Sequence, residues 1–428
     1  MSGAQILLAA IDAGGTVPPA LGVAADLIRR GHHVRVLADP TVESSARAAG
    51  CAFTPWTSAP HFKTLADQTA AIGAAEHGNP RERLQVVSRF TSGRATRGFA
   101  DDVLSTVGAH ATDGVLVEAA LPGMLMGAEA SGLPCAGLMA NLYMRPTQGL
   151  PPVGTAWSPG EDPPRRLRDT LALKVSRLAT RGFARPLNRV RAEYGLAPVT
   201  DLFEQLDHLA RVLVLSSVGF DFPTRLPPNV RYVGPQLDDP DWTAGGHDWR
   251  PDGDEPLVLV AMSSVYQGQS DLLRTVAIAL GSLPVRAVIT TGRAVAPDEV
   301  PAAGHVRVVR SAPHRDVLRE ASVVVTHAGH GTVLKTLSAG VPLVCIPMGR
   351  DQHANTTRVL RLGAGVRVGR RAASVSRVAA AIRHVLDEPA FTANAKTVAQ
   401  MLATEAATHP NAADEVEAMM GIKPAPHP

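Results

Sequence analysis

Residues 325–355 have the sequence VTHAGHGTVLKTLSAGVPLVCIPMGRDQHAN, and this segment contains the clearest structural pattern of the chain. A β-branched run over 323–326 leads into it, as expected of a strand that is buried on both faces. A glycine-bearing turn, a helical segment over 332–339 and a second apolar run over 343–346 follow. This order of strand, turn, helix and strand predicts a βαβ unit of a parallel sheet.

The turn HAGHGT, residues 327–332, is suited to binding an anion. The first N–H groups of a helix have no backbone partner, and the helix dipole favours negative charge beside them. Gly329 and Gly331 allow the backbone to approach a phosphate closely. His327 can donate to a phosphate oxygen, and Thr332 can cap the helix or donate to an oxygen. For the glycines and Thr332 alone, a tight turn with a capped helix is the competing explanation.

Asp351 and Gln352 follow the strand over 343–346. They stand at its carboxyl end, where open α/β sheets bind ligands. A carboxylate accepts hydrogen bonds, and an amide both donates and accepts them, so the pair suits adjacent sugar hydroxyls. Capping of the helix that begins near His353 explains Asp351 equally well.

The same alternation of strands and helices runs along the whole chain. Apolar runs predict strands over 5–11, 33–37, 114–117, 135–139, 212–215, 257–261, 287–291 and 306–309. We therefore expect an α/β protein with two Rossmann-like, doubly wound parallel-sheet domains that face a central cleft. The expected divisions are an N-terminal domain over 1–233, a linker over 234–255, a C-terminal domain over 256–410 and a tail over 411–428 with the first domain as its candidate packing partner.

Composition narrows the classes of protein. The 42 basic and 39 acidic side chains give a net charge of +3, and aromatic residues are only 4%, so no nucleic-acid partner is expected. Cys51, Cys135 and Cys345 are far apart among apolar neighbours, which predicts no disulfide framework and no metal site and favours the cytoplasm. The N-terminal apolar run lacks a basic flank, so we expect a first strand and not a signal peptide.

The combination of H-x-G-x-G-T, then G-V-P, then D-Q resembles the nucleotide-sugar motif of family 1 glycosyltransferases of the bacterial natural-product type, which have the GT-B fold. The resemblance implies that Asp351 and Gln352 hold the donor sugar. It implies that the donor diphosphate is held by His327, Gly329, Gly331 and Thr332, with His330 in the same turn. Ser263 and Ser264 match a second phosphate-contacting loop, and Ala312 and Arg350 complete the predicted donor site.

The expected catalytic base is missing from the N-terminal turn. Family members usually have G-H-V-x-P there, with His as the general base, whereas this chain has Thr16 in the segment GTVPP. A hydroxyl cannot act as a base unaided. Glu118 follows the strand over 114–117, where the family places the carboxylate that orients the His, and it could be the base itself. Asp12 is another candidate; a carboxylate that stabilises a helix N-terminus is the competing explanation for Glu118.

Two further departures from the family pattern concern the residues expected around the nucleoside. Lys335 stands where the family often has Glu for the ribose, so it either contacts a phosphate or is solvated, and we favour the solvated state. Ser311 stands where an aromatic residue often stacks on the base.

The segment 165–191 predicts a basic amphipathic helix, which either touches lipids or, as we favour, is a solvated helix beside the acceptor site.

We therefore expect an inverting glycosyltransferase that moves a sugar from a UDP- or dTDP-sugar to a hydroxyl of a hydrophobic natural-product aglycone. The nucleotide sugar is a co-substrate, and neither a cofactor nor a metal is expected. Membrane contact is not expected, and a homodimer is left open. The alternatives are a lipid-linked GlcNAc transferase, a sugar-nucleotide epimerase and a non-catalytic sugar-nucleotide-binding partner.

Overall fold

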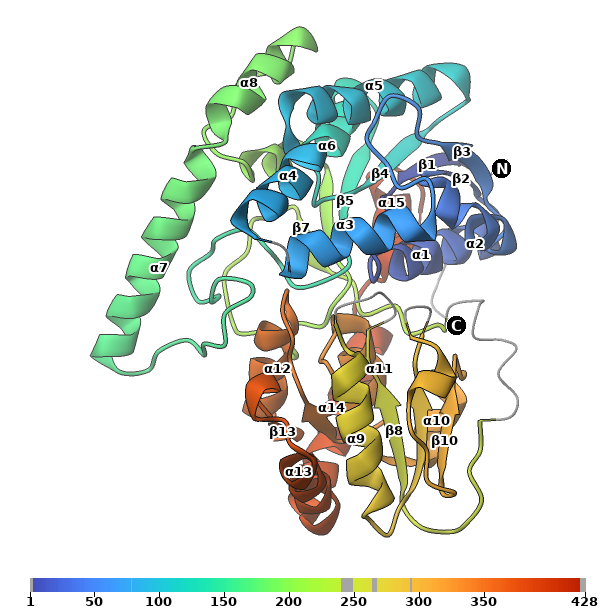
Figure 1. The fold of residues 1–428 in the computed structure, drawn as a ribbon. Helices are drawn as coiled ribbons and strands as arrows, with labels where there is room; N and C mark the ends of the chain where they lie inside the picture. The colour runs from blue at the N-terminus through green and yellow to red at the C-terminus, as the bar shows by residue number, and fades with distance from the viewer. Residues whose placement is uncertain (1–2, 78, 240–248, 264–267, 293–294, 424–428) are drawn as a thin grey trace.

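The computed structural model describes residues 3–77, 79–239, 249–263, 268–292 and 295–423. Its strands form two entirely parallel sheets, one in each half of the chain (Figure 1). Sheet A contains β1 (Gln5–Ala9), β2 (His33–Ala38), β3 (Ala52–Pro55), β4 (Gly114–Glu118), β5 (Cys135–Met139), β6 (Arg211–Val214) and β7 (Val230–Tyr232). Sheet B contains β8 (Leu257–Ala261), β9 (Arg286–Thr290), β10 (Val306–Val309), β11 (Ala321–Thr326), β12 (Leu343–Cys345) and β13 (Gly365–Arg367).

Helices cover both sheets, as the apolar composition of the strands requires. The N-terminal half has α1 (Val17–Arg29), α2 (Glu43–Ala48), α3 (Leu65–His77), α4 (Pro80–Thr91), α5 (Gly93–Ala109), α6 (Pro122–Ala130), α7 (Pro163–Arg181) and α8 (Ala184–Glu193). The C-terminal half has α9 (Ser270–Gly281), α10 (His314–Glu320), α11 (His330–Ser338), α12 (Gln352–Arg361), α13 (Val375–Asp387), α14 (Pro389–Thr408) and α15 (Ala412–Met419). No helix in the described ranges is long and apolar enough to cross a membrane.

The two sheets have the same strand order over six strands, and sheet A has a seventh, β7, at its edge. Sheet A runs β3-β2-β1-β4-β5-β6-β7, and sheet B runs β10-β9-β8-β11-β12-β13. The order therefore reverses between β1 and β4 in one sheet and between β8 and β11 in the other. Ligands of doubly wound folds bind outside the carboxyl ends of the strands at such switch points. The expected α/β architecture with two doubly wound sheets is confirmed.

The C-terminal helix α15 packs on the N-terminal half of the chain. Arg30 contacts Asp414 and Glu417 at 2.8 Å each, and Arg211 contacts Glu415 at 2.7 Å. Figure 1 shows this helix, the reddest described segment, beside α1. The chain therefore crosses between the two halves a second time before it ends.

One region without a clear sequence pattern is helical, and one sequence expectation differs from the structure. The region 58–97 contains α3, α4 and the start of α5. The start of α4 has a complete capping box, in which Asn79 and Glu82 satisfy each other's backbone N–H groups. The basic segment 165–191 is two helices, because the chain leaves the helical path at Gly182 and Phe183 before α8.

Candidate active site

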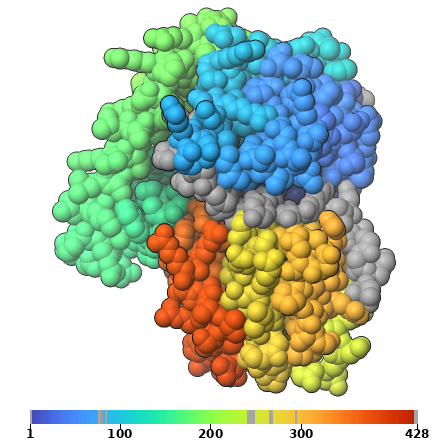
Figure 2. Space-filling model, in the orientation of Figure 1, coloured from blue at the N-terminus to red at the C-terminus, as the bar shows by residue number. Residues whose placement is uncertain are grey.

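A cavity of about 840 Å³ lies between the carboxyl edges of the two sheets. Figure 2 shows the N-terminal half, blue to green, above the C-terminal half, yellow to red. Thr16 and Glu118 line the cavity from the switch point of sheet A, and Ser263 and His327 line it from that of sheet B. The volume is in the range of sites for small molecules. The N-terminal half also contributes an apolar wall that includes Phe62, Ile72, Phe90, Met139, Leu142 and Met144.

Glu118 is the last residue of β4, and its side chain is only 8% exposed. Its Oε2 accepts a hydrogen bond of 3.2 Å from the backbone N–H of Ile11, and the Thr16 hydroxyl donates to the Ile11 carbonyl at 3.4 Å. Burial raises the pKa of Glu118 to about 7, with smaller contributions from the negative charges of Asp39 and Asp12. Stabilisation of a helix N-terminus does not explain this residue, because α6 begins only at Pro122.

Asp12 and Asp39 stand beside Glu118 but have different surroundings. The Asp12 carboxylate accepts a hydrogen bond from the Thr41 hydroxyl at 2.8 Å and borders a second cavity behind α1, not the central one. Asp39, which the sequence reasoning missed, accepts from the backbone N–H groups of Phe62 and Asp12. Burial raises the pKa of Asp39 to about 6. Asp39 thus fixes the loops around the base candidate and is fully engaged in doing so.

The N-terminus of α11 faces the cavity with its backbone N–H groups. Its N-cap is Gly329, which makes no side-chain capping bond, and Thr332 is the third residue of the helix. Thr332 is therefore not the cap that the sequence left as an option. Gly329 is required here, because a Cβ on it would lie 2.7 Å from Nε2 of His327. His330, Gly331 and Thr332 all line the cavity.

His327 follows β11 and is 7% exposed. Burial lowers its pKa to about 4, although the charge of Asp351 and a hydrogen bond with the backbone of Ala261 oppose the shift. The imidazole is consequently neutral at pH 7. A neutral imidazole has one N–H donor, so the turn presents mainly N–H dipoles and little net charge to a ligand.

Asn355 connects the two donor segments and was also missed from the sequence. Its Nδ2 donates to the Ala328 carbonyl at 3.0 Å and to Oδ2 of Asp351 at 2.9 Å, and its Oδ1 lies 3.2 Å from Nδ1 of His330. The side chain is completely buried. Asn355 therefore holds the turn at 327–332 and the start of α12 in a fixed relation.

Asp351 and Gln352 have unlike surroundings. Asp351 occupies the N-cap position of α12 but makes no capping hydrogen bond, so capping does not explain its side chain. Gln352 uses its Oε1 to accept from the backbone N–H groups of Met348 and Gly349, at 2.7 and 3.0 Å. Both residues and Arg350 line the cavity. Arg350 also reaches across to the N-terminal half, with Nη1 3.4 Å from the Ala13 carbonyl oxygen.

The other predicted donor residues that the structure describes, Ser263 and Ala312, also line the cavity, and Ala312 is 1% exposed. Ser264 lies outside the described residues. Ser311, which departs from the family pattern, lines the cavity as well. His314, which had no predicted function, lines it too, and burial lowers its pKa to about 4.

Lys335 is not solvated, so that expectation was wrong. Its Nζ lies 2.9 Å from Oδ1 of Asp239 and donates to the Asp238 carbonyl at 2.6 Å, and both side chains of the ion pair are 14% exposed. Asp239 also accepts from the backbone N–H of Arg315 at the start of α10. Both partners line the cavity. The carboxylate in this part of the site thus comes from the chain just after β7, and Lys335 fixes its position.

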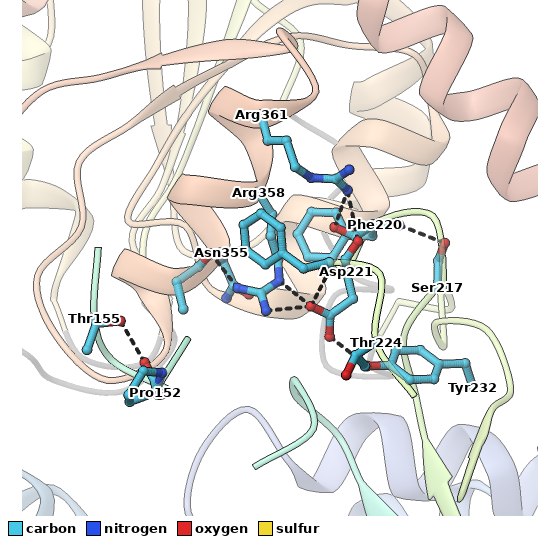
Figure 3. A network of polar contacts seen from close by, with 12 residues as sticks. Pro152, Thr155, Ser217, Phe220, Asp221, Thr224, Tyr232, Asn355, Arg358 and Arg361 are labelled. Atoms are coloured by element: carbon cyan, nitrogen blue, oxygen red, sulfur yellow. Dashed lines mark hydrogen bonds and ion pairs between the residues drawn. The ribbon is translucent and has the colours of Figure 1, made fainter. Parts of the chain in front are cut away.

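A buried ion pair joins α12 to the N-terminal half (Figure 3). Arg358 contacts Asp221, with side chains 4% and 2% exposed, and the Tyr232 hydroxyl donates to the other oxygen of Asp221 at 2.6 Å. Arg361 donates to the carbonyls of Phe220 and Asp221 at 3.0 Å each. The helix that begins at the donor segment 350–352 is therefore anchored to the other half through its last turns.

Within the described parts of the chain, no three His, Cys, Asp or Glu side chains come together in a way that could hold a metal ion.

Comparison with known proteins identifies the family. Residues 166–427 match the family described as UDP-glucoronosyl and UDP-glucosyl transferase. The chain belongs to this family and is a glycosyltransferase. It is 28% identical over 429 residues to the 4'-demethylrebeccamycin synthase of Lentzea aerocolonigenes, covering 98% of this chain and all of that protein. It is 30% identical to the oleandomycin glycosyltransferase of Streptomyces antibioticus over 40% of each chain.

Solved structures agree on the GT-B fold. The calicheamicin glycosyltransferase CalG4 superposes with a TM-score of 0.75 at 21% identity, over 98% of this chain and 99% of that one. The Streptomyces sp. SF2575 glycosyltransferase SsfS6, solved with thymidine diphosphate, has a TM-score of 0.61 at 21% identity, over 98% and 99% of the two chains. The resemblance that the sequence motif suggested is thereby confirmed at the level of family and fold.

Proposed function

We propose that this enzyme is an inverting, metal-independent glycosyltransferase that moves a sugar from a UDP- or dTDP-sugar to a hydroxyl of a hydrophobic natural-product acceptor. The observation that carries the proposal is the composition of one cavity. A buried carboxylate with a pKa near 7 lies on one side of it, and a helix N-terminus with open N–H groups lies on the other.

Glu118 acts as the general base. A base is most effective when its pKa is near the working pH, and burial brings Glu118 there. It removes the proton from the acceptor hydroxyl while the oxygen attacks the anomeric carbon. Thr16, which lines the same cavity as Glu118, orients the acceptor or a water molecule. Asp12 is the weaker candidate, because its carboxylate is directed to Thr41 and away from the cavity.

The leaving diphosphate is bound by the α11 N-terminus and His327. Backbone N–H groups and the helix dipole stabilise the charge that grows on the leaving oxygen. Ser263 and Arg350 add polar contacts from the same edge of the cavity. Asp351 accepts hydrogen bonds from the donor-sugar hydroxyls, while Gln352 shapes the loop that presents Asp351. No step requires a metal.

The nucleoside occupies the part of the cavity that Ala312, His314 and Asp239 line. A thymidine diphosphate complex of a related fold supports a dTDP donor, and the family description supports a UDP donor. The apolar wall of the N-terminal half suits a hydrophobic acceptor. The rebeccamycin, oleandomycin and calicheamicin relatives, whose names concern natural products, support that class.

The test is an assay of the purified protein with UDP- and dTDP-sugars and a panel of polycyclic and macrolactone alcohols, followed by mass spectrometry. We expect a product heavier by one glycosyl unit and acceptor-dependent release of nucleoside diphosphate, with inverted anomeric configuration. Epimerised donor without acceptor would indicate an epimerase instead. Donor binding with no turnover on any acceptor would indicate a binding protein.

A further inference from the structure

Helix α7 carries an apolar stripe that faces solvent. Leu167, Leu171, Val175 and Leu178 are 60%, 52%, 66% and 69% exposed. Their spacing of i, i+4, i+8 and i+11 places them on one face of the helix. No residue of the 19-residue helix is buried. Contiguous exposed apolar residues on a protein surface usually mark a site of interaction.

The apolar face of α7 is turned away from the protein, and its polar face is turned toward it. Its partly covered positions, on the side of Asp169, Leu173 and Ser176, lie opposite the stripe at 3.6 residues per turn. An amphipathic helix normally turns its apolar face to the core. Figure 1 shows α7, in green, extending along the edge of the molecule away from both sheets. The apolar side is therefore directed outward, away from the protein.

The charge on α7 is strongly positive. It contains six basic residues and one acidic residue, whereas the whole chain has a net charge of only +3. The acidic residue, Asp169, is paired with Arg168 at 2.7 Å. Lys174 and Arg181 stand beside the stripe on one side, and Arg168 stands beside it on the other. An apolar stripe with basic borders is complementary to an anionic surface that has an apolar layer beneath it.

Trp157 extends the stripe onto the neighbouring loop. It borders a shallow apolar groove together with Leu167, Leu171 and Val175. The Arg168 guanidinium lies 4.8 Å from the centre of the Trp157 ring. Indole rings and snorkelling arginines are the side chains that favour the boundary between water and acyl chains.

We propose that α7 and Trp157 dock this enzyme, in the plane of the surface, on a membrane that contains anionic lipids. Apolar side chains enter the boundary between headgroups and acyl chains, and the basic borders bind the lipid charges. A second copy of the chain fits this face less well. Two copies of α7 packed stripe to stripe would bring twelve basic residues together, and their charges would repel. A stable protein interface also buries roughly 1,000 Å² or more, which is large for four side chains on one helix.

The loop from Val153 to Trp157 connects the docking face with the central cavity. Val153 lines the central cavity, and Trp157, four residues later, contacts the α7 groove. One loop therefore borders both the cavity and the α7 groove. If the proposed transferase function holds, a hydrophobic acceptor dissolved in the membrane enters from this side.

Vesicle flotation of the full chain tests the docking without any substrate. Wild type is mixed with phosphatidylcholine vesicles or with vesicles that also contain phosphatidylglycerol, at about 0.1 M and about 0.5 M salt. The apolar variant is Leu171→Gln with Leu178→Gln, and its matched control is Ile278→Gln with Leu360→Gln, at exposed apolar positions elsewhere. The charge variant is Lys174→Glu with Arg181→Glu, matched by Arg377→Glu with Arg383→Glu on α13.

We expect binding to the anionic vesicles only, weakened by salt, and a loss of roughly tenfold or more in both α7 variants but not in the controls. Transfer to a water-dissolved acceptor should be unchanged in all four variants, which separates a failure of docking from a failure of the transferase proposal. Absence of wild-type binding, or α7 variants that bind as wild type does, would overturn the proposal. A dimer that depends on the stripe, without vesicle binding, would assign the face to a second copy instead.

Discussion

The two switch points of this enzyme have the same backbone topology and opposite chemistry. At the end of β4 and β2, burial raises the pKa of Glu118 to about 7 and that of Asp39 to about 6. Beyond β11 and β10, burial lowers the pKa of His327 and His314 to about 4. Loss of hydration disfavours the charged form in every case. One physical cause therefore gives Glu118 the pKa of a base that works at neutral pH and keeps both imidazoles neutral until an anion binds.

The first prediction concerns loss of the base at the switch point of sheet A. Glu118→Gln should lower kcat by roughly two to four orders of magnitude, the usual contribution of general-base catalysis. Nucleoside diphosphate affinity should hardly change, because the donor residues lie on the other sheet. Asp12→Asn is the matched control, since it removes a neighbouring carboxylate that does not line the cavity. Steady-state kinetics would contradict the assignment if Asp12→Asn were the more damaging change.

The second prediction removes the imidazole from the other side. His327→Ala should weaken nucleoside diphosphate binding by roughly 10- to 100-fold, the effect of one hydrogen bond to a charged group. Titration calorimetry measures it, with His353→Ala, a partly exposed histidine of α12, as the control. A bound anion raises the pKa of His327, so wild-type binding should take up protons and tighten as the pH falls from 7 toward 5.5. Unchanged affinity in the variant would contradict the assigned contact.

The third prediction separates the sugar from the phosphates within the donor side. Asp351→Asn keeps a side-chain oxygen that can accept from Asn355 but loses the negative charge. We expect discrimination between donor sugars that differ in one hydroxyl to fall by roughly tenfold, with nucleoside diphosphate affinity nearly unchanged. Competition assays with paired donors measure this ratio. A large loss of diphosphate affinity with intact sugar preference would place Asp351 at the phosphates.

The fourth prediction concerns stability, where the two sides respond to pH in opposite directions. The folded form holds the Glu118 proton between pH 4.5 and about 7, so its burial costs stability as the pH rises through that window. Glu118→Gln should therefore raise the free energy of unfolding at pH 8 by about 1 to 3 kcal/mol and have less effect at pH 5. His327 stays neutral between pH 6.5 and about 4, so its burial costs stability as the pH falls. Denaturant titrations in which His327→Gln gained stability at pH 8 instead of pH 5 would disagree with this account.

The fold could be predicted from the sequence because strands buried on both faces leave continuous apolar runs. Continuous β-branched runs identified most strands, and the glycine turn after β11 identified the switch point of sheet B. The short strands β3, β7 and β13 were missed, because their sequences AFTP, VRY and GVR contain no continuous run of β-branched or leucine residues. The strand that ends at Glu118 was identified, and its position at a carboxyl end made Glu118 a candidate base.

Contacts between distant segments were beyond the reach of sequence patterns. Nothing local shows that Asp239 pairs with Lys335, 96 residues away, or that Asp221 meets Arg358 across 137 residues. Asn355 is one polar residue in a helix until the fold brings Ala328 and His330 beside it. The pKa of Glu118 also depends on burial by elements from the whole N-terminal half. A motif identifies the residues that touch a ligand, whereas the residues that position them appear only in the folded structure.

The proposal that burial makes Glu118 the base has a specific kinetic consequence. The pH dependence of kcat/KM, measured with a non-acidic alcohol acceptor, reports the pKa of the base in the free enzyme. We expect the rate to rise with pH through an apparent pKa near 7 in the wild type, and the remaining activity of Glu118→Gln to lack this limb. A wild-type profile that is flat from pH 5.5 to 8.5, or a limb near 7 that persists in Glu118→Gln, would contradict the account.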